Sequence, residues 1–240
     1  MAIEAELTNL GDHAWAGSYY YGDGLGVNVS LILSPESGYV FEWHGCLGLY
    51  DRNYGDVTRD GDRVRLQFEF ENDQQGFSGI SPELLPIRWG DRHYLIPPGD
   101  VVAFCNAVND GREPRDAGWG GFLLRVGDEA KPVKGFPRVP ARYAAYLLAK
   151  PVRAEIVAIG KSTPAQDAFS GRATQVTINK GTNAGLRVGM TLHVTEPDTV
   201  DRVEIVKSEP EQSQAVITQW PEDGPEPKVG WKLSTRRSWR

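Results

Sequence analysis

The stretch that decides the fold class is Val64-Arg65-Leu66-Gln67-Phe68-Glu69-Phe70. Its apolar side chains occupy every second position, and its polar side chains lie between them. This period of two is typical of a β-strand with one face in a core and the other in water. Turn-forming residues flank it, with Arg59-Asp60-Gly61-Asp62 before it and Asn72-Asp73 after it. We therefore predict a strand over residues 64–70 with a plain turn on each side.

Further strands of this kind are predicted throughout residues 15–128. The runs are 27–33, 39–43, 94–96 and 122–126. Because the connections are mostly short, antiparallel meanders are favoured over β-α-β units. The 27 Gly and 16 Pro residues also suit many strands joined by turns.

Two short helices and one single helical turn are expected between the strands. Residues 100–109 have a helical apolar face that includes Cys105. Residues 81–85 fit a single helical turn ended by a proline. A short helix is expected over 141–149, directly after the proline-rich stretch 131–140.

A smaller strand-rich unit follows the linker. About five strands are expected, at 154–159, 175–179, 191–195, 203–207 and 214–218. The predicted fold class is therefore all-β with two short helices. The predicted parts are an antiparallel barrel with one helix (1–130), a proline-rich linker with a short helix (131–151) and a small β-barrel (152–240).

Charge and composition exclude several classes of function. The net charge is −6 and the sequence pI is about 5.3, so broad binding to nucleic acid or to an acidic membrane is not expected. No apolar run approaches the roughly 18 residues of a transmembrane helix. Residues 1–10 lack the basic and apolar regions of a signal peptide. The location stays open: cytoplasmic from this chain, or periplasmic if a signal peptide was removed.

The residues that open the first strand carry a resemblance. Trp15-Ala16-Gly17 is followed by three tyrosines at 19–21, and Arg125 stands in the last strand of this half. This arrangement resembles lipocalin-like and calycin-type β-barrels over residues 15–128. In those families the Trp closes one end of the barrel against a basic residue of a late strand. The resemblance therefore implies a barrel-closing Trp15–Arg125 pair, a cation–π contact of about 1 kcal/mol.

Two further resemblances concern other parts of the chain. The stretches 89–97, 104–107 and 111–115 are similar to a family of uncharacterised bacterial proteins and imply no particular function. Residues 176–190 read V-T-I-N-K-G-T-N-A-G-L-R-V-G-M. This pattern is similar to small β-barrels of bacterial envelope assembly proteins, namely the C-terminal domain of flagellar assembly protein T and the rod-shape protein C barrels. It implies an SH3-like or OB-like barrel that acts as a scaffolding and protein-contact module.

Metal and cofactor chemistry has little support in the sequence. No HExxH motif or helical histidine pair occurs among His13, His44, His93 and His193. The glycines at 22, 24 and 26 precede a strand and not a helix, so they predict a tight hairpin and not a phosphate site. Cys46 and Cys105 could form a disulfide, but two thiols in a chain of this size more often stay free and buried. The absence of a CxxC motif gives no support to a zinc ribbon or a thioredoxin-like site. We therefore expect no cofactor and no metal.

The aromatic residues of the first strands are the most informative feature for function. Tyr39, Phe41 and Trp43 alternate along one strand, so they share a face. They either fill a narrow barrel or line an apolar cavity. The candidate ligand-binding residues are Tyr20, Tyr39, Phe41, Trp43, His44 and His93.

Three functions are compatible with these patterns. The first is a non-enzymatic bacterial binding or scaffold protein, with a small apolar or aromatic ligand in the first barrel and a protein partner on residues 152–240. The second is an enzyme that uses His44 and His93 with Asp23 or Glu42 as acid–base groups at the barrel mouth. The third is carbohydrate or peptide recognition on an aromatic face, which would need exposed Trp43 and Trp89.

Overall fold

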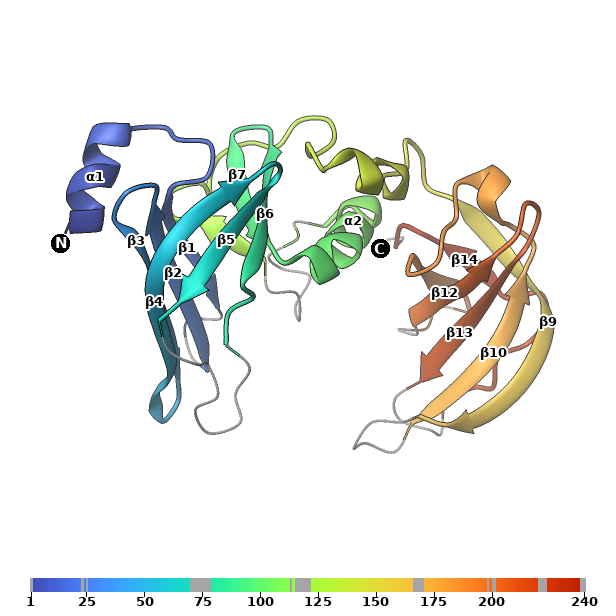
Figure 1. The fold of residues 1–240 in the computed structure, drawn as a ribbon. Helices are drawn as coiled ribbons and strands as arrows, with labels where there is room; N and C mark the ends of the chain where they lie inside the picture. The colour runs from blue at the N-terminus through green and yellow to red at the C-terminus, as the bar shows by residue number, and fades with distance from the viewer. Residues whose placement is uncertain are drawn as a thin grey trace. The chain divides into compact units, whose positions relative to one another are not determined.

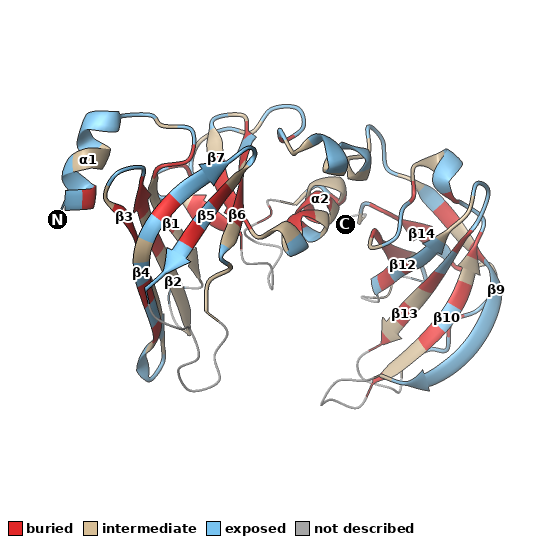
Figure 2. Cartoon of the chain, viewed as in Figure 1, coloured by how far each residue is buried: buried red, intermediate tan, exposed pale blue. Residues whose placement is uncertain are grey.

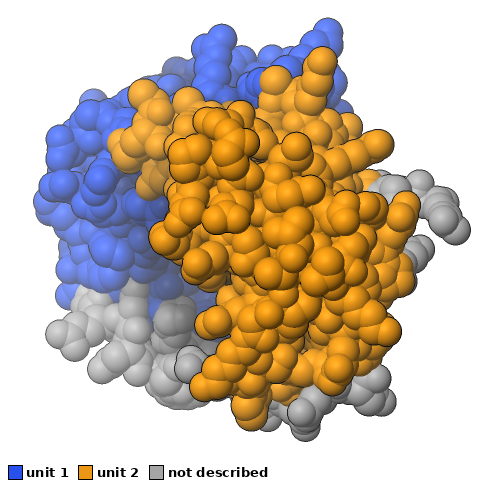
Figure 3. Space-filling model, turned by 90° about the vertical axis from the view of Figure 1, so that its right-hand side faces the viewer, with its two compact units in different colours: residues 1–101, 114–140 blue, residues 102–113, 141–240 orange. Residues whose placement is uncertain are grey.

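The fold is described from a computed structural model of the chain. The structure describes residues 2–22, 24, 26–69, 79–112, 114, 122–165, 171–197, 199, 202–219 and 224–237. The chain forms two compact units, residues 1–101 with 114–140 and residues 102–113 with 141–240 (Figures 1 and 3). Within the described ranges, no helix combines the length and the hydropathy needed to cross a membrane.

The first unit contains a closed barrel of eight antiparallel strands. Their order is β1 (Gly17–Gly22), β2 (Val27–Ser34), β3 (Gly38–Gly45), β4 (Gly48–Asp60), β5 (Arg63–Phe68), β6 (Glu83–Trp89), β7 (Arg92–Ile96) and β8 (Leu123–Arg125). Each strand pairs with the next in sequence, and β8 pairs with β1 through Tyr19↔Arg125 and Tyr20↔Leu124. The predicted antiparallel meander is confirmed, and its eight strands close into a barrel.

The strand predicted over 64–70 is β5, which the structure describes to Phe68. Val64 and Leu66 are buried, whereas Arg65 and Gln67 between them are exposed, as the alternation indicates. Phe70 lies outside the described residues. Its neighbour β4 is the longest strand of the barrel and was not predicted, because its sequence GLYDRNYGDVTRD lacks an apolar alternation.

The helical turn predicted at 81–85 is wrong. Residues 83–89 form strand β6, which pairs with β7 from Leu85↔Ile96 to Trp89↔Arg92. Leu84 and Leu85 are both fully buried. A strand covered on both faces buries neighbouring apolar residues together, and its periodicity does not distinguish it from a helical turn.

An N-terminal helix, α1 (Ala2–Leu10), lies beside the turn between β2 and β3 (Figure 1). Glu6 holds it there. Its carboxylate accepts hydrogen bonds from the Ser34 hydroxyl at 2.8 Å and from the backbone N–H groups of Glu36 and Ser37 at 3.0 and 2.8 Å. This helix was not predicted from the sequence.

The second unit contains a closed barrel of six antiparallel strands. They are β9 (Arg153–Pro164), β10 (Arg172–Ile178), β11 (Thr191–Glu196), β12 (Arg202–Ser208), β13 (Ser213–Gln219) and β14 (Lys232–Ser234), in the order β10-β13-β12-β11-β14-β9. The five predicted strands are confirmed. The sixth, β14, is only three residues long and was not predicted.

The glycine-rich motif 176–190 joins β10 to β11 through the 3-10 helix η5 (Thr182–Ala184). A Cβ atom on Gly181 would lie 1.8 Å from the carbonyl oxygen of Glu209. Only glycine therefore permits this close approach of two backbone segments. The Gly181 carbonyl accepts hydrogen bonds from the N–H groups of Ala184 and Leu186, which fixes the turn.

The helix expected at 100–109 is confirmed as α2 (Val101–Asp110), which follows the 3-10 helix η2 (Pro98–Asp100). Its last turns are bound to the second unit. Asn106 Nδ2 donates to the Gly189 carbonyl at 2.9 Å and Asn109 Nδ2 to the Tyr146 carbonyl at 2.8 Å. Asp110 accepts the backbone N–H of Arg237 at 2.8 Å and lies 3.4 Å from His193 Nε2. Residues 102–110 therefore belong to the second unit.

Two remaining local expectations have clear outcomes. The helix expected at 141–149 is shorter and of the 3-10 type, η4 (Ala141–Tyr146). Cys46 is exposed and Cys105 is fully buried, and no disulfide joins these two described residues. Burial raises the pKa of the Cys105 thiol to about 12, so it stays protonated and unreactive at neutral pH.

Candidate functional site

The inside of the first barrel is the candidate site. Its strands alternate, and the buried side chains of successive strands meet in one core. The inward-facing positions of β1 to β6 include Tyr19, Tyr21, Val29, Leu31, Leu33, Tyr39, Phe41, Trp43, Asp51, Asn53, Val57, Val64, Leu66, Phe68 and Leu84. The odd-numbered strands run from one end of the barrel, called here the Arg125 end, to the other, called the Trp43 end.

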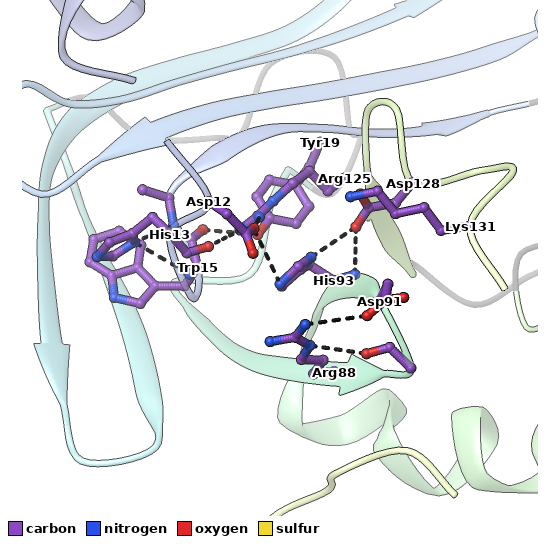
Figure 4. Close-up of polar contacts among 12 residues, drawn as sticks. Asp12, His13, Trp15, Tyr19, Arg88, Asp91, His93, Arg125, Asp128 and Lys131 are labelled. Atoms are coloured by element: carbon purple, nitrogen blue, oxygen red, sulfur yellow. Dashed lines mark hydrogen bonds and ion pairs between the residues drawn. The ribbon is translucent and has the colours of Figure 1, made fainter. Parts of the chain in front are cut away.

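The Arg125 end is closed by polar contacts between β8 and the segment before β1 (Figure 4). The Arg125 guanidinium donates to the His13 carbonyl, to Asp12 Oδ1 at 3.0 Å and to the Tyr19 hydroxyl at 3.1 Å. It also lies over the Tyr19 ring, 5.5 Å from its centroid. Gly17 leaves room for this side chain, because an added Cβ would lie 3.0 Å from Arg125 Nε. Four contacts therefore hold Arg125 in place.

The residues of the implied Trp15–Arg125 pair both lie at this end. Trp15 is 5% exposed and contacts the His13 ring edge-on, with centroids 5.1 Å apart. The Trp15 carbonyl accepts the Tyr19 hydroxyl at 2.9 Å. The cation–π contact that the structure records for Arg125 is with Tyr19. Burial raises the pKa of Tyr19 to about 12, so the hydroxyl stays protonated and donates to Trp15.

A buried His93–Asp128 pair lies next to Arg125 (Figure 4). Asp128 Oδ2 lies 2.9 Å from His93 Nδ1 and accepts the backbone N–H of His93 at 2.7 Å. Asp128 Oδ1 pairs with the Lys131 ammonium at 2.6 Å, and His93 Nε2 lies 3.8 Å from Asp12 Oδ1.

The protonation states of this pair follow from burial and hydrogen bonding. Burial lowers the pKa of His93, which favours the neutral ring at pH 7. Burial of Asp128 acts in the opposite direction, but hydrogen bonds from Lys131 and His93 outweigh it and lower the pKa of that carboxyl. A neutral ring beside a carboxylate carries its proton on Nδ1. The pair therefore orients His93 firmly, but the ring is only 4% exposed.

Burial of the inward-facing side chains decreases along the barrel toward the Trp43 end. Leu31 and Leu33 are 0% exposed and Tyr39 is 1% exposed. Further along the same strands, Val29 and Trp43 are only partly buried. Phe68, at the end of β5, is 36% exposed although its ring lies 6.3 Å from that of Tyr39. Val29, Trp43 and Phe68 are therefore more exposed than the inward-facing residues nearer the Arg125 end.

Two polar side chains lie on the inward face among these aromatic residues. Asn53 is 1% exposed and Asp51 is 2% exposed. Asn53 Oδ1 accepts the Tyr39 hydroxyl at 2.7 Å, and Asp51 Oδ1 accepts the Arg52 backbone N–H at 2.8 Å. In the β3–β4 ladder Asp51 lies opposite Trp43, and Asn53 lies opposite Phe41. Neither residue was predicted to lie at the site, because both belong to β4, whose sequence lacks the apolar alternation of a strand.

The structure brings together half of the predicted ligand-binding residues. Tyr39, Phe41 and Trp43 share the inward face of β3. Tyr20 faces outward, and its hydroxyl donates a hydrogen bond to Asn28 Oδ1 on the neighbouring strand. His44 is half exposed and pairs with Glu42 at 3.3 Å.

The proposed acid–base set is divided between different strands and carboxylates. His44 on β3 is paired with Glu42, whereas His93 on β7 is paired with Asp128, and β3 and β7 are not neighbours. Asp23 lies outside the described residues. Recognition on an aromatic face requires Trp89 to be exposed, and this expectation is wrong. The Trp89 side chain is 9% exposed, and its Nε1–H donates to the Gly135 carbonyl at 2.8 Å. Its ring closes against the segment after β8.

The described residues contain no group of three or more His, Cys, Asp or Glu side chains that could hold a metal ion. Comparison of the chain with protein-family models, with curated proteins and with solved structures finds no match. The structure supports the coarser part of the resemblances, namely two closed antiparallel β-barrels with eight and six strands.

Proposed function

We propose that this protein is a non-enzymatic binding protein whose first barrel takes up a small apolar or aromatic ligand at the Trp43 end. The observation that carries the proposal is the decrease in burial along the inward face, from Leu31 and Tyr39 to Val29, Trp43 and Phe68. An eight-stranded barrel has an interior just wide enough for its own side chains or for one small ligand.

The energetic argument favours an apolar ligand body. Water in contact with inward-facing aromatic and aliphatic side chains costs free energy, at roughly 25 cal/mol per Å² of apolar surface. A ligand that covers Tyr21, Val29, Trp43 and Phe68 removes this contact. The opposite end of the barrel is held closed by contacts within the protein. Arg125 links β8 to β1, and the His93–Asp128 pair links β7 to the segment after β8.

A neutral fluorescent probe tests this proposal. N-phenyl-1-naphthylamine is titrated into the protein, and its emission is expected to rise saturably with one site per chain. Val29→Trp fills the inward face at the Trp43 end and is expected to abolish the signal. The control is Ser30→Trp, the next residue on β2, whose side chain faces outward. A probe signal that is absent, or equal in both variants, would contradict binding inside the barrel.

The second barrel is proposed to be a protein-contact module. All eight residues of β9 from 157 to 164 are exposed, including Val157 at 44% and Ile159 at 41% (Figure 2). β14 pairs with β9 only at 153–155, and among the described residues no other strand pairs with the edge beyond. Such an edge favours a partner that adds an extended strand through main-chain hydrogen bonds.

Site-specific crosslinking tests this second role. A photoreactive residue at Val157 is expected to give a discrete crosslinked product, and a second substitution, Ile159→Lys, is expected to remove that product. The same photoreactive residue at Val206, an exposed position on β12, is the control. A product that forms equally at Val206, or that survives Ile159→Lys, would overturn strand addition along β9.

A further inference from the structure

The loop at the tip of the β3–β4 hairpin differs in chemistry from other hairpin loops of the first barrel. Gly45 pairs with Gly48, so the loop is Cys46-Leu47, and the Leu47 side chain is 91% exposed. Two-residue hairpin loops usually favour Asn, Asp and Gly. The fully described loops between β2 and β3, β4 and β5, and β6 and β7 each contain an exposed acidic residue, namely Glu36, Asp62 and Asp91. The β3–β4 loop presents an apolar side chain instead.

A β-bulge turns a second leucine outward beside this loop. The β3–β4 ladder shifts register after Trp43, and the next pair is His44↔Leu49. Tyr50 is the extra residue on the bulged strand. Because paired residues share a face, Leu49 lies with His44 on the outer face of the barrel, where it is 42% exposed. The end of this hairpin is therefore exposed at the Trp43 end of the barrel (Figure 2).

Contacts within the hairpin hold the tip in place. The Tyr50 ring packs edge-on against Trp43, with ring centroids 5.8 Å apart. Gly45 permits this packing, because an added Cβ would lie 2.0 Å from Tyr50 Cε2. The Tyr50 hydroxyl accepts the backbone N–H of Leu47 at 3.4 Å. This N–H group therefore has an acceptor inside the hairpin, which lowers the free-energy cost of moving the tip out of water.

The charged side chains of the hairpin begin behind the tip. No Asp, Glu, Lys, Arg or His occurs from residue 45 to residue 50. Behind this stretch, His44 pairs with Glu42 at 3.3 Å, and Glu42 lies opposite Arg52 in the ladder. At about 3.3 Å per residue, Arg52 lies roughly 10 Å along the strand from Leu49. This spacing is close to the roughly 5–10 Å by which an amphipathic segment enters the boundary between lipid headgroups and acyl chains.

The small size of the tip favours a lipid surface over a protein partner. A stable protein interface buries about 800 Å² on each partner, which is far more than two leucines and one cysteine provide. A bilayer needs no complementary shape and takes up any apolar side chain that reaches it. The net charge of −6 opposes approach to anionic lipids, so the surface that fits best is zwitterionic.

We propose that the tip of the β3–β4 hairpin inserts Leu47 and Leu49 into the surface of a zwitterionic lipid bilayer. The contact is weak and reversible, because two leucines bury much less apolar surface than a lipid anchor does. It places the Trp43 end of the barrel at a phase in which apolar molecules dissolve. The inference rests on the hairpin alone and does not depend on the ligand proposed for the barrel.

Vesicles of phosphatidylcholine test this inference with the full chain. Cys46 is exposed and Cys105 is fully buried, so a thiol-reactive nitrobenzoxadiazole dye labels the tip selectively. The dye emission is expected to shift to the blue and to rise saturably as lipid is added. Nitroxide groups on the lipid acyl chains are expected to quench it. Emission that does not change with lipid would overturn insertion of the tip.

Sedimentation of the unlabelled protein with the same vesicles measures the contribution of the tip. Leu47→Asn places a common turn residue in the loop and is expected to weaken partitioning at least about tenfold, which corresponds to about 1.4 kcal/mol. Val126→Asn is the matched control, because Val126 follows Arg125 at the opposite end of the barrel and is 56% exposed. It is expected to leave partitioning unchanged. Equal partitioning of Leu47→Asn and the wild type, or binding only to vesicles that contain anionic phosphatidylglycerol, contradicts the inference.

Discussion

The two ends of the first barrel use similar residue types for different purposes. At the Arg125 end, Tyr19 and Trp15 are buried and engaged by Arg125 and His13. At the Trp43 end, Tyr21 and Trp43 occupy equivalent inward positions but are only partly buried. A carboxylate is buried at each end, since Asp128 is 1% exposed beside His93 and Asp51 is 2% exposed opposite Trp43. One end is closed by contacts within the protein, and the other is the end at which we propose that a ligand binds.

The largest expected effect contrasts two inward-facing phenylalanines. Phe41→Ala is expected to cost about 3–5 kcal/mol of unfolding free energy, because the ring is 2% exposed and its removal leaves a cavity. Phe68→Ala, at a position 36% exposed, is expected to cost about 1 kcal/mol. Urea denaturation of both variants measures the difference. Equal losses would mean that the two inward-facing rings are packed alike.

The next effect concerns the charged groups at the Arg125 end. Arg125→Met is expected to destabilise the protein by about 2–4 kcal/mol, because it leaves the His13 carbonyl and Tyr19 hydroxyl without this donor in a largely buried setting. Arg52→Met, on the exposed outer face of β4, is expected to change stability by less than about 0.5 kcal/mol. Urea midpoints give both values. A loss of similar size at Arg52 would remove the special role assigned to Arg125.

A smaller contrast comes from single hydroxyl groups on β1. Tyr19→Phe is expected to cost about 1–2 kcal/mol, since the hydroxyl donates to the Trp15 carbonyl and accepts from Arg125. Tyr21→Phe removes the same atom two residues along the strand, where the side chain is partly exposed, and is expected to cost less than about 0.5 kcal/mol. Thermal unfolding of the two variants distinguishes them. The reverse order would show that the Tyr21 hydroxyl, and not that of Tyr19, is structural.

The last contrast is in pH dependence. Burial lowers the pKa of His93 below the ordinary 6.5, while the charges that face the ring, Asp128, Asp12 and Arg125, act with mixed sign. Below pH 6.5 the unfolded chain therefore binds more protons than the folded chain, so stability is present above this pH and is lost as the pH falls through the folded pKa. Unfolding free energies between pH 7.5 and 5 are expected to fall less steeply in His93→Gln than in the wild type.

His44→Gln is the control for this pH experiment, because its side chain is 50% exposed on β3. Burial also lowers the pKa of His13, so part of the slope is expected to persist in His93→Gln. An unchanged slope in His93→Gln would mean that the His93–Asp128 pair does not couple protonation to folding.

Residues with regular alternation were predicted well from the sequence. Strand β5 and the strands of the second barrel follow it, because alternate side chains of a strand point to opposite faces. Strand β4 does not follow this alternation, because Asp51 and Asn53 occupy inward-facing positions where apolar residues are expected. A polar residue on an inward face is invisible to a pattern that assumes an apolar interior.

The sequence by itself determined the all-β class, the two strand-rich halves and the shared face of Tyr39, Phe41 and Trp43. These features depend on side-chain period and turn residues, which are local properties of the chain. The tertiary structure alone decided that Arg125 meets Tyr19, that His93 meets Asp128, and that the end of helix α2 binds the second unit. These contacts join residues 35 to 106 positions apart. Their choice depends on strand register and barrel closure, which no local pattern encodes.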